Sequence, residues 1–171
     1  MMGARHPDER EGEVTLPFDP ARAADGPRVM FIGHVRSPWK ERGDCPRNIP
    51  MARSRMAEMG VTASIEVDEA FRPGLLSLEK HAYIIVLYWM SEAARHIIIQ
   101  RPRALKGLHG VFALRSPVRP NPLALATVRV LGLDAEKGII EIDAIDCVDG
   151  TPLIDIKPWM EEIDMPPREG R

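Results

Sequence analysis

Tyr83-Ile-Ile-Val-Leu-Tyr-Trp-Met90 is the stretch that decides the fold of this 171-residue chain. It is apolar throughout and rich in β-branched and aromatic residues, a pattern typical of a central strand buried on both faces. We therefore expect this strand to lie in the middle of the core.

Further strand signals lie on both sides of this stretch. Short segments of alternating or continuous apolar residues, bounded by Pro or Gly, predict strands over 29–36, 63–68, 111–114, 123–133 and 138–146. Residues 134–138 have the length of a hairpin connection between the last two. Helix signals are fewer: one helix over 51–59 that closes on Gly60, and a helical turn over 72–79 that begins through Pro73. Because no strand-helix-strand alternation occurs, we expect a mainly β fold, a single small β-barrel, antiparallel or mixed, with short helical additions.

Length and composition fit one domain. Residues 1–27 are rich in charge, Pro and Ala and predict a flexible N-terminal tail, followed by a barrel domain over 28–163 and a C-terminal tail over 164–171. No apolar run approaches the roughly 20 residues of a membrane span. Two cysteines and five histidines show no metal-ligand spacing, so we predict no metal and a reducing, cytoplasmic location.

Charge is unevenly distributed although the net charge is only −2. Residues 91–121 contain six basic residues and one acid, whereas residues 134–164 contain ten acids and two lysines. This polarity suits a basic patch for a phosphate-bearing partner beside an acidic pocket for a cationic one. A solvated surface with accidental clustering is the alternative.

The segment Gly110-Val-Phe-Ala-Leu-Arg-Ser-Pro-Val-Arg-Pro-Asn-Pro122 is stiff and cationic. Its three prolines fix their own φ near −65° and hold the residue before each of them extended. A stiff loop that presents Arg115 and Arg119 is suited to grip an anionic or planar group. Neither a glycine-rich dinucleotide turn nor a P-loop occurs, so any adenosyl cofactor is held in another way.

Four motifs together resemble the TsaA/TrmO family. They are the loop above, Asp146-Cys-Val-Asp-Gly-Thr-Pro-Leu-Ile-Asp-Ile-Lys-Pro158, Ile32-Gly-His-Val-Arg-Ser-Pro-Trp-Lys-Glu41 and Pro46-Arg-Asn48, and the resemblance runs from about Met30 to Met160. It implies a small β-barrel methyltransferase that uses S-adenosylmethionine and acts as a homodimer. Characterised bacterial members methylate threonylcarbamoyl-adenosine next to the tRNA anticodon.

The resemblance also implies site residues. An Asn can read the adenine edge, Trp89 can stack on the base or pack in the core, and Arg115 can pair with the donor's carboxylate. The implied cofactor contacts are Asn48, Ile49, Trp89, Met90, Arg115, Leu125, Ala144 and Asp146.

Asp146 and Asp149 are the candidate catalytic residues. Either carboxylate could neutralise the donor sulfonium or accept the proton of the methylated nitrogen. Alternatively, an Asp before Gly caps its own turn.

The expected substrate contacts are Arg119 and Asn121, which bind the acceptor nucleotide or tie their loop to neighbouring carbonyls, and Arg101 and Arg103, which suit tRNA phosphates.

Three departures from the family pattern keep other functions open. Ala82-Tyr83 replaces a Ser-His pair, Leu123-Ala124 replaces Ile-Gly, and the characterised bacterial form has a further C-terminal domain, whereas this sequence ends at Arg171. The first hypothesis is a tRNA methyltransferase. The second is a methyltransferase of the same fold acting on a small molecule or another nucleoside, and the third is a non-catalytic protein that binds S-adenosylmethionine or RNA.

Overall fold

The structure is a computed structural model that describes residues 9–23, 26 and 28–167. The chain divides into two compact units: a small unit, Met1–Arg28 with Met90–Ala124, and a barrel unit, Val29–Trp89 with Leu125–Arg171. The sequence predicts one domain over 28–163, whereas the structure groups residues 90–124 with the N-terminal segment. Positions 1–8, 24–25 and 27 of the predicted N-terminal tail and 168–171 of the predicted C-terminal tail lie outside the described residues.

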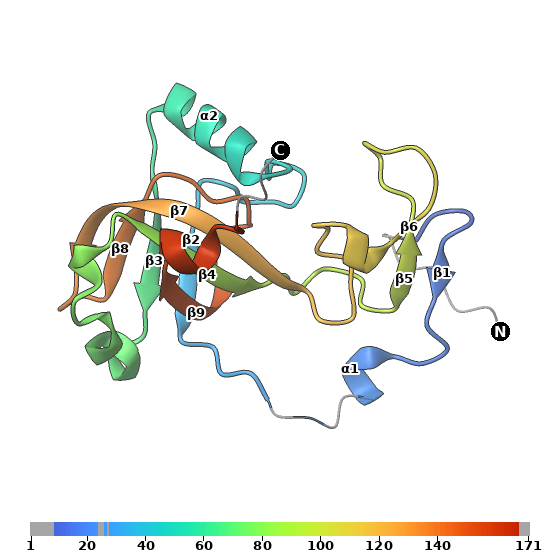
Figure 1. Cartoon of the computed structure of the whole chain (residues 1–171), viewed down its shortest axis with the longest axis horizontal. Coiled ribbons are helices and arrows are strands. Elements are labelled where there is room, and N and C mark those ends of the chain that lie inside the picture. Colours follow the sequence, from blue (N-terminus) through green and yellow to red (C-terminus); the bar gives the residue numbers. More distant parts are fainter. Residues whose placement is uncertain (1–8, 24–25, 27, 168–171) are drawn as a thin grey trace. The chain divides into compact units, whose positions relative to one another are not determined.

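Six strands form a closed barrel in the order β2-β3-β8-β7-β4-β9 (Figure 1). The barrel closes because β9 pairs antiparallel with both β4 and β2, and β2 pairs antiparallel with β3. The strands are β2 (Gly33–Arg36), β3 (Ala63–Val67), β4 (Tyr83–Trp89), β7 (Leu123–Asp134), β8 (Ile139–Ile142) and β9 (Thr151–Pro158). The prediction of a mainly β chain with short helical additions is confirmed.

Alternate side chains of the strands form the core, because successive residues of a strand point to opposite faces of the sheet. In β2, for example, Val35 is fully buried between exposed His34 and Arg36. Each aliphatic side chain removed from water contributes roughly 1.5–3 kcal/mol. The fully buried residues of the barrel strands are Val35, Ile65, Ile84, Val86, Val128, Ile140, Ile142 and Leu153.

Strand β4 differs from the expectation of burial on both faces. Ile84, Val86 and Tyr88 are buried, but Ile85, Leu87 and Trp89 are only half-buried. A strand of a closed barrel has one face toward the interior and one toward the outside, so an apolar run does not by itself require two buried faces.

Helix α2 (Ile49–Met59) has a capping residue at each end. The Asn48 side chain accepts a hydrogen bond from the Met51 N–H at 2.9 Å, and Gly60 ends the helix in the left-handed conformation with φ 66°. The predicted stop at Gly60 is correct. Of the three methionines that suggested the helix, only Met56 is buried, while Met51 and Met59 are exposed.

Other predicted elements are found with changed bounds or type. The helical turn expected over 72–79 is present as two 3-10 segments, η1 (Glu69–Leu75) and η2 (Leu78–Lys80). The hairpin between β7 and β8 is confirmed, and there Asp134 accepts from the Lys137 N–H at 3.0 Å. The strand predicted over 111–114 is wrong, because Val111–Ala113 forms a 3-10 turn, η3, closed by Leu114 N–H donating to Val111 O.

The small unit contains a three-stranded sheet of β1 (Val14–Thr15), β5 (Ile97–Gln100) and β6 (His109–Gly110), besides a short helix α1 (Pro20–Ala23). Its buried cluster is Ala94, Ile97 and Val118. The described part of the predicted N-terminal tail is therefore structured. Leu16 N–H donates to His96 O at 2.7 Å, and Glu13 accepts from Arg101 N–H at 2.6 Å. Hydrogen bonds rather than apolar burial hold this segment, and for that reason its polar composition did not predict it.

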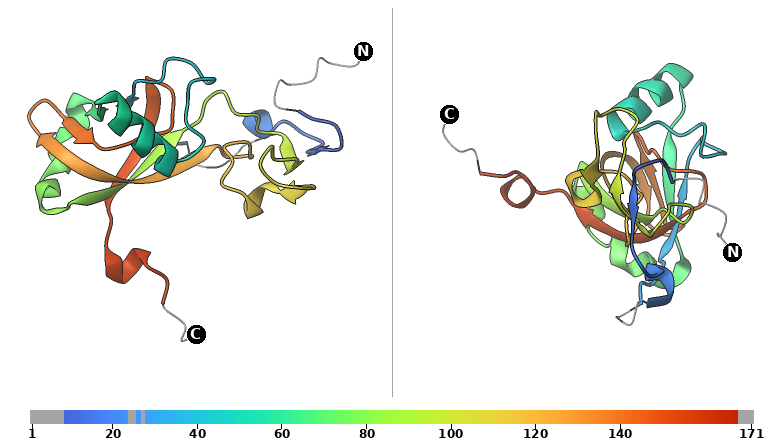
Figure 2. Two further views of the ribbon diagram at one scale, coloured as in Figure 1. Left: turned by 90° about the horizontal axis from the view of Figure 1, so that it is seen from above. Right: turned by 90° about the vertical axis from the view of Figure 1, so that its right-hand side faces the viewer.

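The last described helix, α3 (Glu161–Asp164), follows β9 directly. Figure 2 shows α3 extending away from the barrel. Within α3, Ile163 is 72% exposed.

Gly33 predicts a stability effect at the β2–β3 contact. A Cβ atom added at Gly33 would lie 2.0 Å from the Glu66 carbonyl oxygen. Because that oxygen belongs to a paired strand, we expect Gly33→Ala to destabilise the fold at the upper end of the roughly 1–3 kcal/mol typical of overpacking. Urea denaturation measures the effect, with Gly43→Ala as control because a Cβ at Gly43 meets no atom within 4 Å. Equal midpoints for the two variants would contradict this account.

Candidate active site

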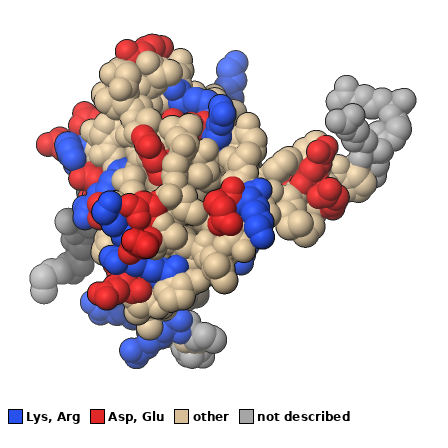
Figure 3. All heavy atoms as spheres, turned by 90° about the vertical axis from the view of Figure 1, so that its left-hand side faces the viewer, with Lys and Arg blue, Asp and Glu red and all other residues tan. Residues whose placement is uncertain are grey.

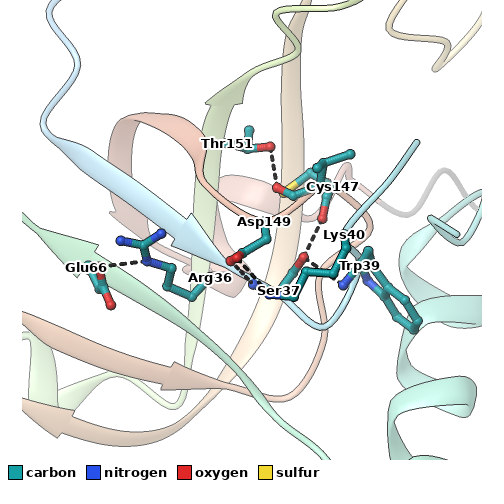
Figure 4. Close-up of polar contacts among 9 residues, drawn as sticks. Arg36, Ser37, Trp39, Lys40, Glu66, Cys147, Asp149 and Thr151 are labelled. Atoms are coloured by element: carbon teal, nitrogen blue, oxygen red, sulfur yellow. Dashed lines mark hydrogen bonds and ion pairs between the residues drawn. The ribbon is translucent and has the colours of Figure 1, made fainter. Parts of the chain in front are cut away.

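Two of the sequence motifs meet where β2 ends (Figure 4). Ser37, directly after β2, donates its hydroxyl to Cys147 O at 2.7 Å, and Trp39 donates its indole N–H to Ile145 O at 2.7 Å. In the opposite direction, the backbone N–H of Asp149 donates to Trp39 O at 2.8 Å. Ser37 is only 7% exposed, so these bonds satisfy polar groups that water hardly reaches.

Asp149 forms the charged part of this junction. Its carboxylate accepts from the Lys40 ammonium at 2.8 Å and from the Ser37 backbone N–H at 3.1 Å. The hydrogen bond from Lys40, supported by that from Ser37, lowers the pKa of Asp149 below its ordinary value. A carboxylate stabilised as an anion in this way is a weak base. Its hydrogen bonds to Ser37 and Lys40 hold the turn between Asp146 and Gly150 in place.

Asp146 has a different partner on the barrel. The Tyr88 hydroxyl donates to the Asp146 carboxylate at 2.5 Å. Tyr88 is 2% exposed and lies one residue before Trp89 at the end of β4. The two aspartates of the motif therefore have separate surroundings: Asp149 contacts the end of β2, and Asp146 contacts the end of β4.

Both cysteines are free thiols. Cys147 is fully buried, and burial raises the pKa of its thiol far above the ordinary value. Cys147 is therefore not a nucleophile at neutral pH. Cys45 is half-buried, with its sulfur 3.6 Å from Glu41 O.

The predicted cofactor residues fall in both units. Met90 and Arg115 belong to the small unit, where Met90 N–H donates to Pro122 O at 2.9 Å and Arg115 is exposed. The other six belong to the barrel unit: Asn48, Ile49, Trp89, Leu125, Ala144 and Asp146. Within the barrel unit, Trp89 ends β4, Leu125 lies near the start of the neighbouring strand β7, and buried Ala144 lies two residues before Asp146.

Asn48 has one of its polar atoms already in use. Its side-chain oxygen caps α2 by accepting from Met51 N–H. The amide nitrogen can still donate two hydrogen bonds. Asn48 can therefore donate to an acceptor atom of an adenine while its oxygen holds the helix cap.

The predicted substrate residues lie in the small unit. Arg119 donates to Ser116 O at 2.9 Å and Val111 O at 3.0 Å, and also to Leu114 O. The alternative that Arg119 ties its loop to neighbouring carbonyls is thus what the geometry supports. Asn121, Arg101 and Arg103 are exposed.

Three residues of the junction escaped the sequence analysis: Ser37, Lys40 and Tyr88. Tyr88 lay inside an apolar run, although a buried Tyr hydroxyl needs a hydrogen-bond partner. That requirement was a usable signal, but it could not identify Asp146, which is 58 residues away.

On the face of the barrel unit that Figure 3 shows, Lys and Arg are intermixed with Asp and Glu rather than separated by sign. The acidic segment 134–164 suggested an acidic pocket, but several of its carboxylates form ion pairs. These pairs are Asp134–Lys137, Asp143–Arg53, Asp149–Lys40 and Asp155–Lys157. The local field of this segment is consequently weaker than its composition suggests.

A hollow of about 570 Å³ lies beside the junction. Its lining includes Arg36, Lys40, Thr62 and Glu141, and Asp149 is the predicted site residue that it contains. Within residues 9–23, 26 and 28–167, no group of three or more His, Cys, Asp or Glu side chains is arranged to hold a metal ion. No helix among the same residues is long and apolar enough to cross a membrane.

The closed barrel and the junction of the two motifs define a mainly β protein with a TrmO-like fold. A crystal structure of TrmO from Pseudomonas aeruginosa matches with a TM-score of 0.63 and 27% identity, over 85% of this chain and 61% of that one. The family model described as tRNA-methyltransferase O N-terminal domain matches residues 34–165. The chain therefore belongs to the TrmO family, as the motifs indicated.

Two curated relatives illustrate the range of the family. A protein of Rhizobium radiobacter named "Probable S-adenosyl-L-methionine-binding protein VirR" is 37% identical over 130 residues, which cover 76% of this chain and 69% of the relative. The tRNA (adenine(37)-N6)-methyltransferase of Escherichia coli is 33% identical over 133 residues, which cover 75% of this chain and 56% of the relative. The matched region thus spans about two thirds of the first relative and just over half of the second.

The lowered pKa of Asp149 predicts a pH-dependent contribution to stability. Because the folded-state pKa lies below the unfolded value of about 3.9, the carboxylate stabilises the fold above that pH and loses this effect as the pH falls through the folded pKa. We expect Asp149→Asn to cost about 1 kcal/mol at pH 7, and the difference from the parent to shrink below about pH 4.

Denaturant titrations from pH 7 to pH 3 measure this difference. Introducing Asp149→Asn into a Lys40→Met background should have a smaller effect at pH 7, because the main partner is already removed. A difference that stays constant over the whole range would assign the stabilisation to a cause other than this carboxylate.

Proposed function

We propose that this protein is an S-adenosylmethionine-dependent methyltransferase that methylates threonylcarbamoyl-adenosine next to the anticodon of tRNA. The observation that carries the proposal is the junction of the two motifs, inside the family match, with Asp146 against Tyr88 at the end of β4. The names of the relatives support both halves of the proposal, since one is named for S-adenosylmethionine and the other for tRNA adenine methylation.

The residues of the barrel unit suit the cofactor chemically. Asp146 offers a carboxylate for a cationic sulfonium, and the Tyr88 hydroxyl donates a hydrogen bond that holds this carboxylate in place. Asn48 offers amide donors for an adenine nitrogen, and half-buried Trp89 offers an aromatic face. Considered by itself, Arg115 of the small unit has a guanidinium that can form a bidentate pair with a carboxylate such as that of the methyl donor.

Asp146 and Asp149 have different roles in this proposal. Bound S-adenosylmethionine supplies an electrophilic methyl group, so that the S–CH₃ bond breaks with its electron pair left on sulfur while an N–CH₃ bond forms. Asp146 holds the cationic donor, and a carboxylate there helps binding more than it lowers the barrier. Asp149 maintains the turn and is not the base. The chain then acts mainly by positioning the nitrogen against the methyl group, and Asp146 or water accepts the nitrogen's proton.

On the substrate side, Arg101 and Arg103 contact tRNA phosphates, and Asn121 contacts the acceptor nucleotide. These contacts predict binding that weakens as salt rises, because each neutralised phosphate releases counterions. A tRNA substrate and two free cysteines also fit a cytoplasmic protein.

Isothermal titration with S-adenosylmethionine and S-adenosylhomocysteine tests the cofactor half of the proposal. We expect micromolar binding by the parent. Arg115→Ala should bind roughly 10- to 100-fold more weakly, because it loses a charge-assisted hydrogen bond. Arg103→Ala removes another exposed guanidinium from the same unit and should bind as the parent does. Parent-like affinity of Arg115→Ala would overturn the assignment of Arg115.

Methyl transfer to tRNA that carries threonylcarbamoyl-adenosine tests the substrate half. Transfer that requires this modification supports the proposal. Binding of the cofactor with transfer only to another nucleoside or a small molecule favours the second hypothesis. Binding without any transfer favours a non-catalytic role.

We also propose that the protein is a homodimer. Apolar side chains are exposed on the barrel unit near the end of β9, where Tyr83 is 44% exposed and packs edge-on against Trp159 at 6.2 Å, and on α3, where Ile163 is 72% exposed. We expect light scattering to report a dimer that Ile163→Asp weakens, because burying a charge in an apolar contact is unfavourable. Leu76→Asp, at another exposed apolar position, is the control. A monomeric parent with full activity would remove this proposal.

A further inference from the structure

The turn η3 presents an aromatic side chain to solvent. Phe112 is 80% exposed, whereas its neighbour Val111 is fully buried. Leaving a Phe in water forgoes roughly 1.5–3 kcal/mol of burial free energy. A turn that anchors one apolar residue and exposes the next, larger one is suited to contact a partner.

The backbone of this turn is held in place. Arg119 donates to the carbonyls of Val111 and Leu114, on either side of Phe112, and also to Ser116 O. Arg95 donates to Pro120 O at 2.7 Å in the same loop. Phe112 is therefore pre-positioned, and a partner that binds it pays little ordering entropy.

The sequence around Phe112 is cationic. No Asp or Glu occurs from Ala93 to Leu133. Arg103 and Lys106, in the connection between β5 and β6, are exposed, and no ion pair to either is found among the described residues. The His109 ring lies 2.9 Å from Lys106 O, which fixes the end of this connection at β6, and β6 leads directly into η3.

An exposed aromatic ring in a cationic segment fits single-stranded nucleic acid. Unpaired bases stack on aromatic faces while Lys and Arg contact the flanking phosphates. A second copy of this chain fits less well, because a twofold contact through the same patch would bring Arg103 and Lys106 close to their own counterparts.

We propose that Phe112 stacks on an unpaired base of an RNA loop, with Arg103 and Lys106 on the adjacent phosphates. The inference rests on the proposed function for the identity of the RNA. It makes Phe112 a positioning residue that favours looped over fully paired RNA. Phe112 acts by orienting the loop and not by touching the reacting atoms.

Fluorescence anisotropy with a labelled 17-nucleotide stem-loop, and with a fully paired duplex as comparison, tests the proposal. We expect Phe112→Ala to bind the stem-loop roughly 5- to 150-fold more weakly than the parent and the duplex equally well. Phe112→Trp should retain the affinity. Leu76→Ala, which truncates an 87% exposed side chain of the barrel unit, should behave as the parent.

Two further measurements separate stacking from a structural or electrostatic effect. A 2-aminopurine in the loop should be quenched on binding by the parent and by Phe112→Trp, but not by Phe112→Ala. Arg103→Gln should reduce the slope of log K against log salt concentration by about 1, the contribution of one phosphate contact. Phe112→Ala should leave this slope unchanged. Circular dichroism checks that each variant is folded.

Several outcomes would overturn the inference. If Phe112→Ala binds the stem-loop as the parent does while the parent methylates tRNA, the stacking role is wrong and the proposed function stands. A parent that binds no stem-loop overturns the inference, and whether the parent still methylates tRNA then decides the proposed function separately. Conversion of a dimeric parent to a monomer by Phe112→Ala would assign the ring to a second copy.

Discussion

The hydrogen bonds between Ser37 and the segment from Cys147 to Asp149 are the constraint on which the barrel unit depends. They lie next to the pairing of β2 with β9, which closes the barrel. Since Ser37 is almost completely buried, an unmade bond here would leave a desolvated polar group, which costs about 1–3 kcal/mol. Closure of the sheet and formation of the motif junction therefore depend on adjacent residues.

This junction explains why two aspartates three residues apart have different surroundings. The turn before β9 passes through Gly150, whose φ of 77° lies in the left-handed region that favours glycine. Asp149 precedes that glycine and contacts Lys40 beside β2, while Asp146 contacts Tyr88 on β4. The carboxylate that pairs with a neighbouring lysine stabilises the loop beside β2, and the other carboxylate is tied to strand β4.

In the small unit, a cationic side chain stabilises the backbone of its own loop. Arg119 looked like a ligand-binding residue because it is presented by a stiff proline-rich loop, yet it donates to three carbonyls of that loop. The guanidinium fixes the backbone, and the consequence is a rigid turn with Phe112 on the outside. Stiffness and side-chain exposure thus belong to different residues of one motif.

The sequence by itself determined what depends on near neighbours along the chain. Alternating apolar residues identified β2 and β3, Gly60 marked the end of α2, and residues 134–138 formed the hairpin, because strand period, helix cap and turn are local properties. The motifs also sufficed to identify the family.

Only the tertiary structure decided which groups meet. The pairs Tyr88–Asp146 and Lys40–Asp149 join positions 58 and 109 residues apart, and no local pattern encodes such a pairing. The same applies to η3. Its apolar residues predicted a strand, but the segment forms a turn that buries Val111 and is held by Arg119.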